Sequence, residues 1–434
     1  MNSVWINTGS LPSFPHLEGD TKTDVLVIGG GLAGILTTHA LTQAGADCLL
    51  IEADTICGGV TGNTTAKITS QHGLIYAKLQ KEFGSETARM YWQANQDALA
   101  RYRALCQNIS CEFERKDAFI YTTGAGRKLE QELDVLNRLK IPAEFTTKLP
   151  LPFSVHGAIR FPDQAQFHPL KFVAGLVPGL NIREHTTASA IEGTVVHTNH
   201  GKIQAKNVIV ATHFPYLNKY GSYFLKLYQE RSYVLGLERA QNVDGMYLGV
   251  GEDELSFRNY GSLLLLGGNS HRTGKTGSGW SVLEKFARRK YPEARVKYRW
   301  ATQDCMTLDG IPYIGAYSRN TPNLYVATGF NKWGMTSSMA AATLLCDLVT
   351  GKENPYAQLF SPTRTMLRPQ LAANSLEAAI NLITPTKPRC PHLGCALKWN
   401  PHEHSWDCPC HGSRFDQKGK LLDNPATGDI EPPS

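Results

Sequence analysis

The sequence predicts an α/β protein in which a parallel-sheet unit at the N-terminus is joined to further strand-rich segments and a small C-terminal domain. Three observations predict this fold. A β-branched apolar run at 24–28 leads into a glycine-rich turn and a helix, strand-like segments recur between 194 and 268, and residues 390–434 are rich in Cys, His, Gly and Pro. A chain of 434 residues has room for two to three domains of roughly 150 residues each.

The composition narrows the class of protein. Hydrophobic residues make up 42% and charged residues 19%, so the chain can form a packed core and is not a disordered chain. The formal charge of +6 is small for this length and gives no reason to expect a nucleic-acid partner. The most apolar stretch, 25–44, is interrupted by glycines and polar residues, and no signal peptide is visible. We therefore expect a soluble cytoplasmic protein without a membrane span.

The first β-α-β unit carries a phosphate-binding signature. Residues 24–28 predict a buried parallel strand, and a G-x-G-x-x-G motif follows at Gly29, Gly31 and Gly34. In this motif the first glycine makes a tight turn, the second lets a pyrophosphate approach the backbone, and the third lets helix and strand pack closely. The next predicted strand ends at Glu52, where an acid accepts hydrogen bonds from ribose hydroxyls. These features together predict dinucleotide binding.

Further elements follow from the periodicity of apolar residues. Helical periodicity runs through 83–140, and later segments predict strands at 194–212, 231–238, 245–268 and 324–327, a helix at 337–349, and a linker at 351–389 with a helix near 370–383. The segment 268–276 approaches a phosphate loop, but Asn269 stands where a glycine is needed and glycines follow where a helix should begin. We reject that second phosphate site.

Five segments together carry a family resemblance: 23–29, 52–66, 308–315 (Leu-Asp-Gly-Ile-Pro-Tyr-Ile-Gly), 327–330 and 334–336. Through them, about residues 20–350 resemble the D-amino-acid oxidase-like, or glycine oxidase-like, FAD-dependent amine oxidoreductases. The resemblance implies FAD as the cofactor, and we find no second fingerprint for NAD(P)H. It also implies a fold in which an α/β FAD-binding (Rossmann-type) domain is interrupted by an inserted α+β, antiparallel-sheet substrate domain.

The resemblance also implies a division of the chain into domains. The FAD-binding domain is expected at 1–80, 145–220 and 300–355, the substrate domain at 81–144 and 221–299, a linker with a helix at 356–386, and the C-terminal domain at 387–434.

The same resemblance implies further contacts with FAD. They are expected at Thr61, Thr64, Thr65, Ala66, Ala188, Asp309, Gly310, Gly315, Gly329, Gly334, Met335 and Thr336. A helix that begins near 337 would direct its N-terminus at the flavin and stabilise the negative charge of the reduced ring. Asn63 stands where some relatives carry a histidine that attaches flavin covalently, so we expect non-covalent FAD.

Members of the family that this sequence resembles oxidise C–N bonds. Three residues of this sequence are candidates for a corresponding catalytic site. Arg258 could hold a substrate carboxylate and Tyr233 could cover the pocket, although an arginine at the surface or sheet edge is the simpler interpretation of Arg258. Lys332 could stabilise charge near the flavin or be a solvated loop lysine. Many relatives carry an arginine shortly before the Asp-Gly segment, where this chain has Gln303, which weakens any specific case for an amino-acid carboxylate.

The C-terminal segment contains a metal-binding pattern. Cys390, His392, Cys408 and His411 form C-x-H-x15-C-x-x-H. This strongly resembles a Rieske centre and implies that the two cysteines bind one iron of a [2Fe–2S] cluster and the two histidines the other. A zinc knuckle is the alternative because Cys2His2 sets also bind zinc, but zinc motifs usually pair C-x2-4-C with H-x3-5-H.

Other residues of this segment add detail to the resemblance. Cys395 and Cys410 match the pair that forms a disulfide in cytochrome bc-type Rieske proteins. Ser413 can donate a hydrogen bond to a cluster sulfide, whereas Phe415 lacks the hydroxyl of high-potential relatives, so we expect an intermediate potential between roughly −150 and +300 mV. The β-rich domain is small, so we expect it to pack against the flavoprotein body or the predicted 370–383 helix. We expect residues 424–427 to form the loop that covers the cluster.

The two cofactors together suggest a function. Flavin accepts two electrons as a hydride, whereas a [2Fe–2S] cluster passes one electron at a time. We therefore expect a dehydrogenase that oxidises an amine or amino acid and passes electrons through the cluster to an external acceptor. The alternatives are an electron-transfer reductase in which the cluster feeds the flavin, and a redox-sensing or scaffold protein that the cluster stabilises.

Overall fold

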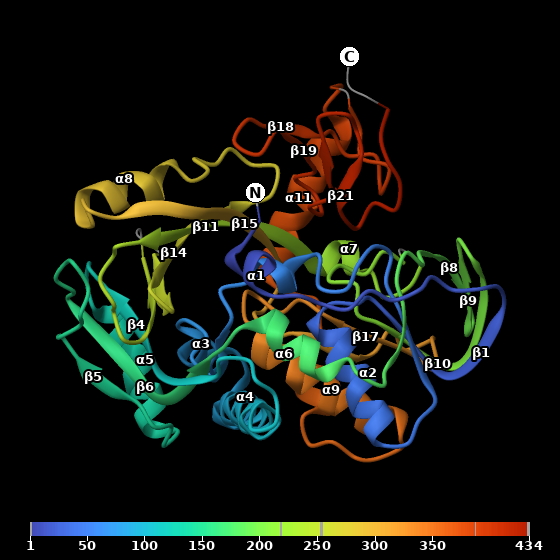
Figure 1. The fold of residues 1–434 in the computed structure, drawn as a ribbon, viewed down its shortest axis with the longest axis horizontal. Helices are drawn as coiled ribbons and strands as arrows, with labels where there is room; N and C mark the ends of the chain where they lie inside the picture. Colours follow the sequence, from blue (N-terminus) through green and yellow to red (C-terminus); the bar gives the residue numbers. More distant parts are fainter. Residues whose placement is uncertain (1, 218, 252–254, 387, 432–434) are drawn as a thin grey trace.

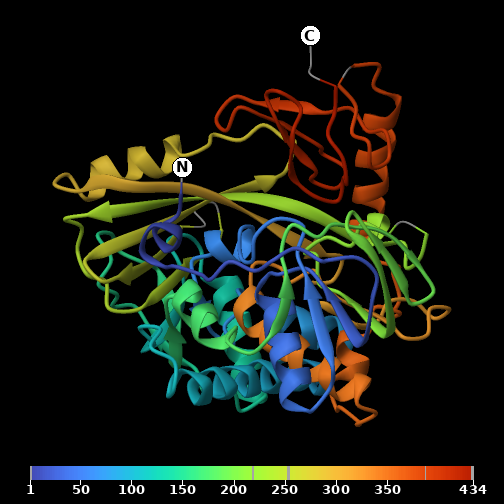
Figure 2. The same ribbon diagram turned by 45° about the vertical axis from the view of Figure 1, so that its right-hand side comes forward.

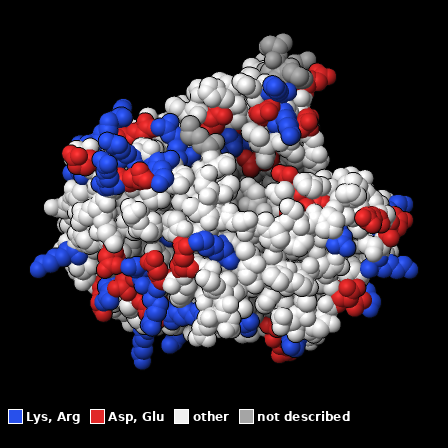
Figure 3. All heavy atoms as spheres, viewed as in Figure 1, with Lys and Arg blue, Asp and Glu red and all other residues white. Residues whose placement is uncertain are grey.

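The computed structural model describes residues 2–217, 219–251, 255–386 and 388–431, so both ends of the predicted range 387–434 lie outside the described residues. Two sheets with their helices form the body, and the C-terminal domain sits on top of it (Figures 1 and 2). No helix in these described ranges is both long and apolar enough to cross a membrane. Acidic and basic side chains are interspersed over the face in Figure 3, with Lys and Arg gathered over α8 (Ser281–Lys290) at the upper left.

The first sheet is the predicted nucleotide-binding sheet. Its order is β16-β17-β10-β1-β2-β7, with β9 and β8 continuing from β10, and the pairs that join β7, β2, β1, β10 and β17 are parallel. The strands are β1 (Thr21–Ile28), β2 (Cys48–Ile51), β7 (Asn181–Arg183), β8 (Ala188–Glu192), β9 (Val195–Thr198), β10 (Gly201–Val210), β16 (Tyr313–Ala316) and β17 (Leu324–Thr328). Residues 25–28 of β1 are all buried, which explains the continuous apolar run.

The second sheet is mostly antiparallel and has nine strands in the order β15-β11-β14-β13-β12-β4-β6-β3, with β5 paired to β6. Its strands are β3 (Lys67–Ile68), β4 (Glu114–Thr122), β5 (Glu144–Thr146), β6 (Gly157–Gln166), β11 (Leu227–Glu238), β12 (Met246–Gly249), β13 (Ser256–Tyr260), β14 (Leu263–Arg272) and β15 (Arg295–Thr307).

Helices cover both sheets. They are α1 (Val4–Thr8), α2 (Leu32–Gln43), η1 (Val60–Asn63), α3 (Ile75–Phe83), α4 (Ser85–Cys106), α5 (Arg127–Arg138), α6 (Pro169–Leu176), α7 (Tyr223–Lys226), α8, α9 (Gly334–Val349), α10 (Ala357–Phe360) and α11 (Pro369–Ile383). α2 and α9, each of which follows a strand of the first sheet, pack against each other (Figure 1).

The structure differs from the sequence predictions in two places. The helical periodicity assigned to 83–140 is interrupted by β4, whose residues become increasingly buried as it pairs with β6. The strands β5, β6 and β15 lie in the second sheet, although the ranges 145–220 and 300–355 were assigned to the FAD-binding domain. Local periodicity cannot reveal this division, because sheet membership depends on pairing between distant strands.

The C-terminal domain is a four-stranded antiparallel sheet, β18 (Lys398–Asn400), β19 (Ser405–Asp407), β20 (Arg414–Asp416) and β21 (Leu421–Asp423). Its polar core is the buried Arg414, which pairs with Glu403, Asp407 and Asp423. Glu403 also accepts a hydrogen bond from Arg231 Nε of β11 at 2.9 Å, so this ion network fastens the domain to the body. α11 runs beside the domain (Figure 2).

The charges around Glu403 predict a pH range for this attachment. Burial alone would raise the pKa of Glu403, but the hydrogen bond and charge of Arg231, together with the charge of Arg414, lower it to about 2. Because the pKa is depressed in the folded state, the contribution to stability is present above the ordinary glutamate pKa of about 4.3 and is lost as the pH falls toward 2.

Replacing Arg231 with Met should destabilise the attachment. The substitution leaves a buried carboxylate with only one of its two arginines, so we expect the free energy of unfolding to fall by about 3 kcal/mol at neutral pH. Urea unfolding followed by tryptophan fluorescence measures the change. Lys297→Met is the matched control, because its ion pair with Glu238 in the same strand pair is exposed and should contribute no more than about 1 kcal/mol. Equal losses in the two variants would contradict this account.

Candidate functional site

The glycine motif forms the turn between β1 and α2. Gly29 has φ +113°, and a Cβ there would lie 2.6 Å from the Ala211 carbonyl oxygen. A Cβ on Gly34 would collide with the Gly29 carbonyl, so this position requires close backbone packing. At Gly31 the nearest atom to such a Cβ is Thr61 Oγ1 at 3.6 Å, which leaves the backbone open toward a cavity. The three glycines thus have the geometry that a bound pyrophosphate needs.

Glu52 ends β2 beside this turn. Its carboxylate accepts hydrogen bonds from the backbone N–H groups of Gly30 at 2.6 Å and Asp54 at 3.0 Å, and it lines the cavity. Burial raises the pKa of Glu52, while these N–H donors lower it. The carboxylate is therefore held in place at the edge where a ribose would bind.

A single cavity of about 2160 Å³ joins the glycine turn to the second sheet and reaches the C-terminal domain. This volume exceeds the roughly 300–1,000 Å³ of an ordinary small-ligand pocket and leaves room for a dinucleotide and a substrate. The sequence-predicted residues that line the cavity are Gly29, Gly31, Glu52, Thr61, Thr64, Thr65, Ala188, Gly329, Gly334, Met335, Tyr233 and Lys332.

The other predicted residues lie behind the cavity surface. They are Gly34, Ala66, Asp309, Gly310, Gly315, Thr336 and Arg258. Asp309 forms a buried ion pair with Arg364 at 2.7 Å, and the hydrogen bonds and charge of that arginine lower the aspartate pKa although burial opposes it. Thr336 contacts His72 Nε2 at 3.2 Å and donates to the Thr69 carbonyl. Thr336 thereby connects α9 with the segment that contains His72, which lines the cavity.

The loop 59–66 is fixed from its outer side. The indole N–H groups of Trp5 and Trp300 donate to the carbonyls of Thr64 and Asn63, at 2.6 and 2.9 Å. The Arg258 guanidinium, which is buried, donates to the Thr65 and Ala66 carbonyls, each at 2.8 Å. The structure therefore places Arg258 behind the loop rather than in the cavity, where it is not available to a substrate carboxylate.

The other two catalytic candidates line the cavity. Lys332 Nζ lies 2.8 Å from Glu230 Oε2. The Tyr233 hydroxyl lies 3.2 Å from His271 Nε2, and burial raises the tyrosine pKa. Lys332 is not a simple solvated side chain, since it belongs to an ion pair. Tyr233 is fully buried and follows Gln229 and Arg231 on the strand face that meets the C-terminal domain, where the charge of Glu403 also raises its pKa, so its hydroxyl is not presented to a substrate.

The strands β11 and β15 form a wall between the part of the cavity beside Glu230 and Asp304 and the cluster loops of the C-terminal domain. We define the β11–β15 wall as the paired segments 229–231 and 303–305, in which Gln229 faces Cys305, Glu230 faces Asp304, and Arg231 faces Gln303. Side chains alternate between the two faces of a strand, and directly paired residues share a face. Gln229, Arg231 and Gln303 contact the C-terminal domain, so Glu230 and Asp304 take the cavity face.

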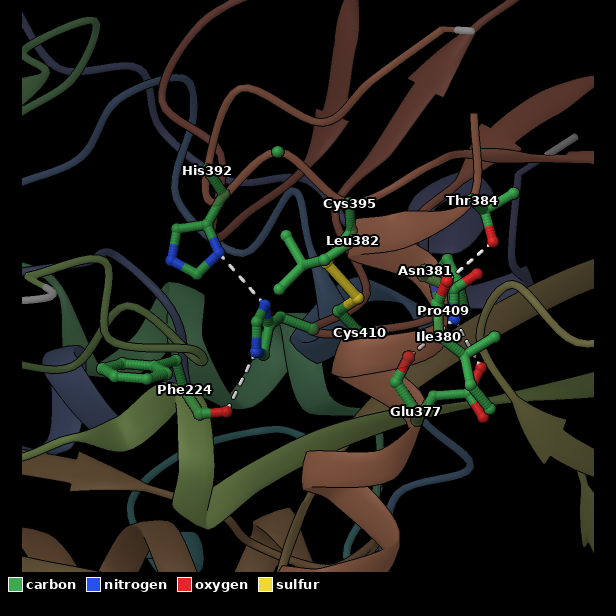
Figure 4. The surroundings of a disulfide bond; sticks show 12 residues. Phe224, Glu377, Ile380, Asn381, Leu382, Thr384, His392, Cys395, Pro409 and Cys410 are labelled. Atoms are coloured by element: carbon green, nitrogen blue, oxygen red, sulfur yellow. Dashed lines mark hydrogen bonds between the residues drawn. A yellow bond between two sulfur atoms is a disulfide. The ribbon is translucent and has the colours of Figure 1, made fainter. Parts of the chain in front are cut away.

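The two histidines of the C-terminal motif face each other. His392 Nδ1 and His411 Nδ1 are 3.3 Å apart (Figure 4). Two nitrogens bound at about 2.1 Å to one tetrahedral metal ion would lie roughly 3.4 Å apart, so this spacing fits two ligands on one iron. His411 Nε2 lies 2.9 Å from the Phe224 carbonyl oxygen, and donation there leaves Nδ1 free to bind metal. Burial lowers the pKa values of both imidazoles, to about 4 and about 3, which keeps them neutral.

The cysteines of the motif divide into two pairs. Cys395 and Cys410 form a disulfide, and the Sγ of Cys408 lies within 4.8 Å of both its sulfurs. Cys390 and Cys408 are free, buried and adjacent. Contacts with the Cys408 thiol, the Ser413 hydroxyl and nearby backbone N–H groups lower the Cys390 pKa to about 7 despite burial. Two free cysteines beside two neutral histidines form the donor set of a Rieske cluster.

The cluster loops are bound directly to the β11–β15 wall. Gln229 Nε2 donates to the carbonyls of His411 at 2.7 Å and Asn424 at 3.1 Å. Gln303 Nε2 donates to the Gly412 carbonyl at 2.8 Å and to Gln229 Oε1 at 3.0 Å. A Cβ on Gly412 would meet the Gln229 side chain, so the loop and the wall are in close contact.

Several of these residues were not predicted from the sequence. Gln229, Glu230, Asp304, Glu403 and Phe224 carry no motif. The period of two along a strand could have placed Gln229 and Arg231 on one face and Glu230 on the other. The pairing with β15 and the seating of the C-terminal domain depend on tertiary structure and leave no local signal.

Comparisons with known proteins identify both parts of the chain. Residues 24–348 match the family described as FAD dependent oxidoreductase, and residues 381–433 match the Rieske [2Fe-2S] domain. The Bacillus subtilis (strain 168) protein YhfW, whose name carries the term Rieske 2Fe-2S iron-sulfur protein, is 36% identical over 98% of this chain and 96% of its own length.

Two further proteins resemble mainly the flavoprotein body. The gamma-glutamylputrescine oxidoreductase of Escherichia coli (strain K12) is 23% identical, over 78% of this chain and 86% of its own. The crystal structure of glycine oxidase from Geobacillus kaustophilus matches the fold with a TM-score of 0.68 at 20% identity, over 80% of this chain and 99% of that chain.

The chain is an FAD-dependent oxidoreductase. It belongs to the family whose model matches residues 24–348, and it carries a Rieske [2Fe–2S] domain at its C-terminal end. The predicted fold class and the two predicted cofactors, FAD and the [2Fe–2S] cluster, are confirmed.

Replacing Gly31 with Val should abolish FAD binding. The side chain would fill the space in which the pyrophosphate contacts the backbone, while the surrounding packing leaves room for it. The flavin absorbance per protein of the purified variant measures the effect, and we expect less than about a tenth of the wild-type content. Gly428→Val is the control, because no atom lies within 4 Å of a Cβ at that position. Near-stoichiometric FAD in the Gly31 variant would mean that this turn is not the phosphate site.

Proposed function

We propose that this protein oxidises a C–N bond of an amine or amino acid at its FAD and passes the electrons, one at a time, through the Rieske cluster to an external acceptor. When bound, FAD supplies hydride acceptance and the cluster supplies one-electron transfer. The proposal includes Cys390 and Cys408 as ligands of one iron and His392 and His411 as ligands of the other.

The observation that carries the proposal is the position of the cluster loop against the β11–β15 wall. Glu230 and Asp304 on one face of the wall line the cavity, and Gln229 and Gln303 on the other face donate hydrogen bonds to the backbone of His411 and Gly412. The ligand His411 is 3% exposed and directed at the body through the Phe224 carbonyl, whereas His392 is only half-buried. This arrangement supports electron entry on the side of His411 and exit on the side of His392.

The chain's own residues provide the rest of the site. The loop 59–66 and the N-terminal end of α9 border the cavity at Thr64, Gly334 and Met335, where they can contact the flavin. The Lys332–Glu230 pair borders the same cavity and can orient a substrate. The names of the relatives, a gamma-glutamylputrescine oxidoreductase and a glycine oxidase, support chemistry at a carbon next to nitrogen.

Replacing His411 with Cys tests the electron path. The substitution exchanges a neutral imidazole for an anionic thiolate, so the cluster potential should fall by on the order of hundreds of millivolts. Each ~59 mV is tenfold in a one-electron equilibrium, so turnover with a one-electron acceptor should fall by about a hundredfold or more, while anaerobic bleaching of the flavin by substrate should continue. An anaerobic amine and amino-acid screen supplies the substrate, and EPR verifies the altered cluster.

The control for this experiment is His402→Cys, which makes the same chemical change at an exposed position of the same domain. It should leave turnover unchanged. Unchanged turnover in the His411 variant, with a verifiably altered cluster, would assign the cluster a structural role. Flavin that no substrate bleaches, but that a reduced cluster reduces, would instead favour a reductase.

A further inference from the structure

The charges on the cavity face of the β11–β15 wall are unbalanced. Glu230 and Asp304 are directly paired across the two strands, so their carboxylates project from the same face. Lys332 Nζ, 2.8 Å from Glu230, neutralises one of them. Asp304 pairs through its backbone with Glu230, and within the described ranges its carboxylate forms no hydrogen bond or ion pair. Removal from water raises the Asp304 pKa to about 6 although Lys332 lowers it, so the group is mainly ionised at pH 7.

The other basic groups of the site are engaged elsewhere. Arg231 projects from the opposite face of the wall and is bound to Glu403. Arg258 lies behind the loop 59–66, and Lys67, on the far strand β3 of the same sheet, donates to the Tyr247 carbonyl and to Ser256. Burial lowers the Lys67 pKa to about 7, with the charge of Arg258 contributing.

Four further cations border the cavity: Arg127, Lys128, Arg414 and Lys420. The buried Arg414 is paired with Glu403, Asp407 and Asp423, and the other three are exposed to solvent, where water screens their charge. Among the described residues that line the cavity, no buried guanidinium is therefore available to a substrate carboxylate. The wall instead presents one uncompensated negative charge beside the loop that carries Lys332.

We infer that the cavity selects a substrate with a second positive charge and no carboxylate, a linear diamine or polyamine cation, held at the wall by Asp304 together with Glu230. This inference rests on the proposed function and narrows its substrate class. A cationic group can replace the water lost from Asp304 and form a charge-assisted hydrogen bond there. A carboxylate at the same place would add a like charge, which the partly desolvated wall would disfavour.

Three probes of matched length test the inference: 1,4-diaminobutane, 1-aminobutane and 4-aminobutanoate. They share a primary amine and differ in the charge at the other end. Each is added anaerobically to the holoenzyme, and both the perturbation of the flavin spectrum on binding and the rate of bleaching are recorded. We expect the diamine to bind at least tenfold more tightly than the monoamine and the amino acid to be weakest.

The variant Asp304→Asn removes the charge and keeps the shape of the side chain. It should reduce the preference for the diamine over the monoamine at least fivefold, and the FAD content should match that of the wild type. Asp244→Asn, an exposed acid paired with Lys116, is the matched control and should retain the preference. The unchanged FAD content separates loss of charge recognition from misfolding.

Three results would overturn the inference: a preference for 4-aminobutanoate, a diamine preference that survives Asp304→Asn, or no spectral change with any of the three probes. The proposed function is judged separately. Bleaching by an amino acid or an uncharged amine in a wider screen would sustain C–N oxidation while removing this substrate class, whereas a flavin that no amine or amino acid reduces would remove both.

Discussion

The contact between the cluster-binding loop and the β11–β15 wall is the constraint on which the rest of this structure depends. Gln229 and Gln303 hold the backbone of His411 and Gly412 from one side, and Phe224 accepts the remaining ring N–H of His411. A four-stranded domain of this size has little apolar core, so its metal site and its attachment to a larger body must supply stability. The same contacts place a cluster ligand one strand pair away from the cavity.

Each strand of this wall carries side chains on one face that border the cavity and side chains on the other face that contact the cluster-bearing domain. Because successive side chains of a strand point to opposite faces, Arg231 can bind Glu403 while its neighbour Glu230 faces the cavity. Gln303 stands where many relatives carry an arginine. Its side chain is uncharged and donates a hydrogen bond to the cluster loop. The attachment of a Rieske domain therefore accounts for a departure that the sequence alone left without a reason.

The sequence was most informative where backbone geometry restricts the residue type. Gly29 and Gly34 occupy positions that no side chain fits, and C-x-H with C-x-x-H is demanded by the ligand chemistry, so both motifs could be recognised from local pattern. For Arg258, the local sequence pattern did not predict where the side chain lies. This residue was a candidate for binding a substrate carboxylate, but its guanidinium supports the loop 59–66, and the acid Asp304 borders the cavity instead. Which face a strand residue takes depends on pairing across more than 70 positions of chain, from Glu230 to Asp304.

The most direct test of the central claim is whether an electron moves from reduced flavin to the cluster within one molecule. The holoenzyme is photoreduced anaerobically without an external acceptor, and the flavin absorbance and the EPR signal of the reduced Rieske cluster are followed together. The account predicts that the cluster signal rises as the flavin loses one electron, at a rate independent of protein concentration. A flavin that stays fully reduced beside an oxidised cluster, or a rate proportional to protein concentration, would contradict it.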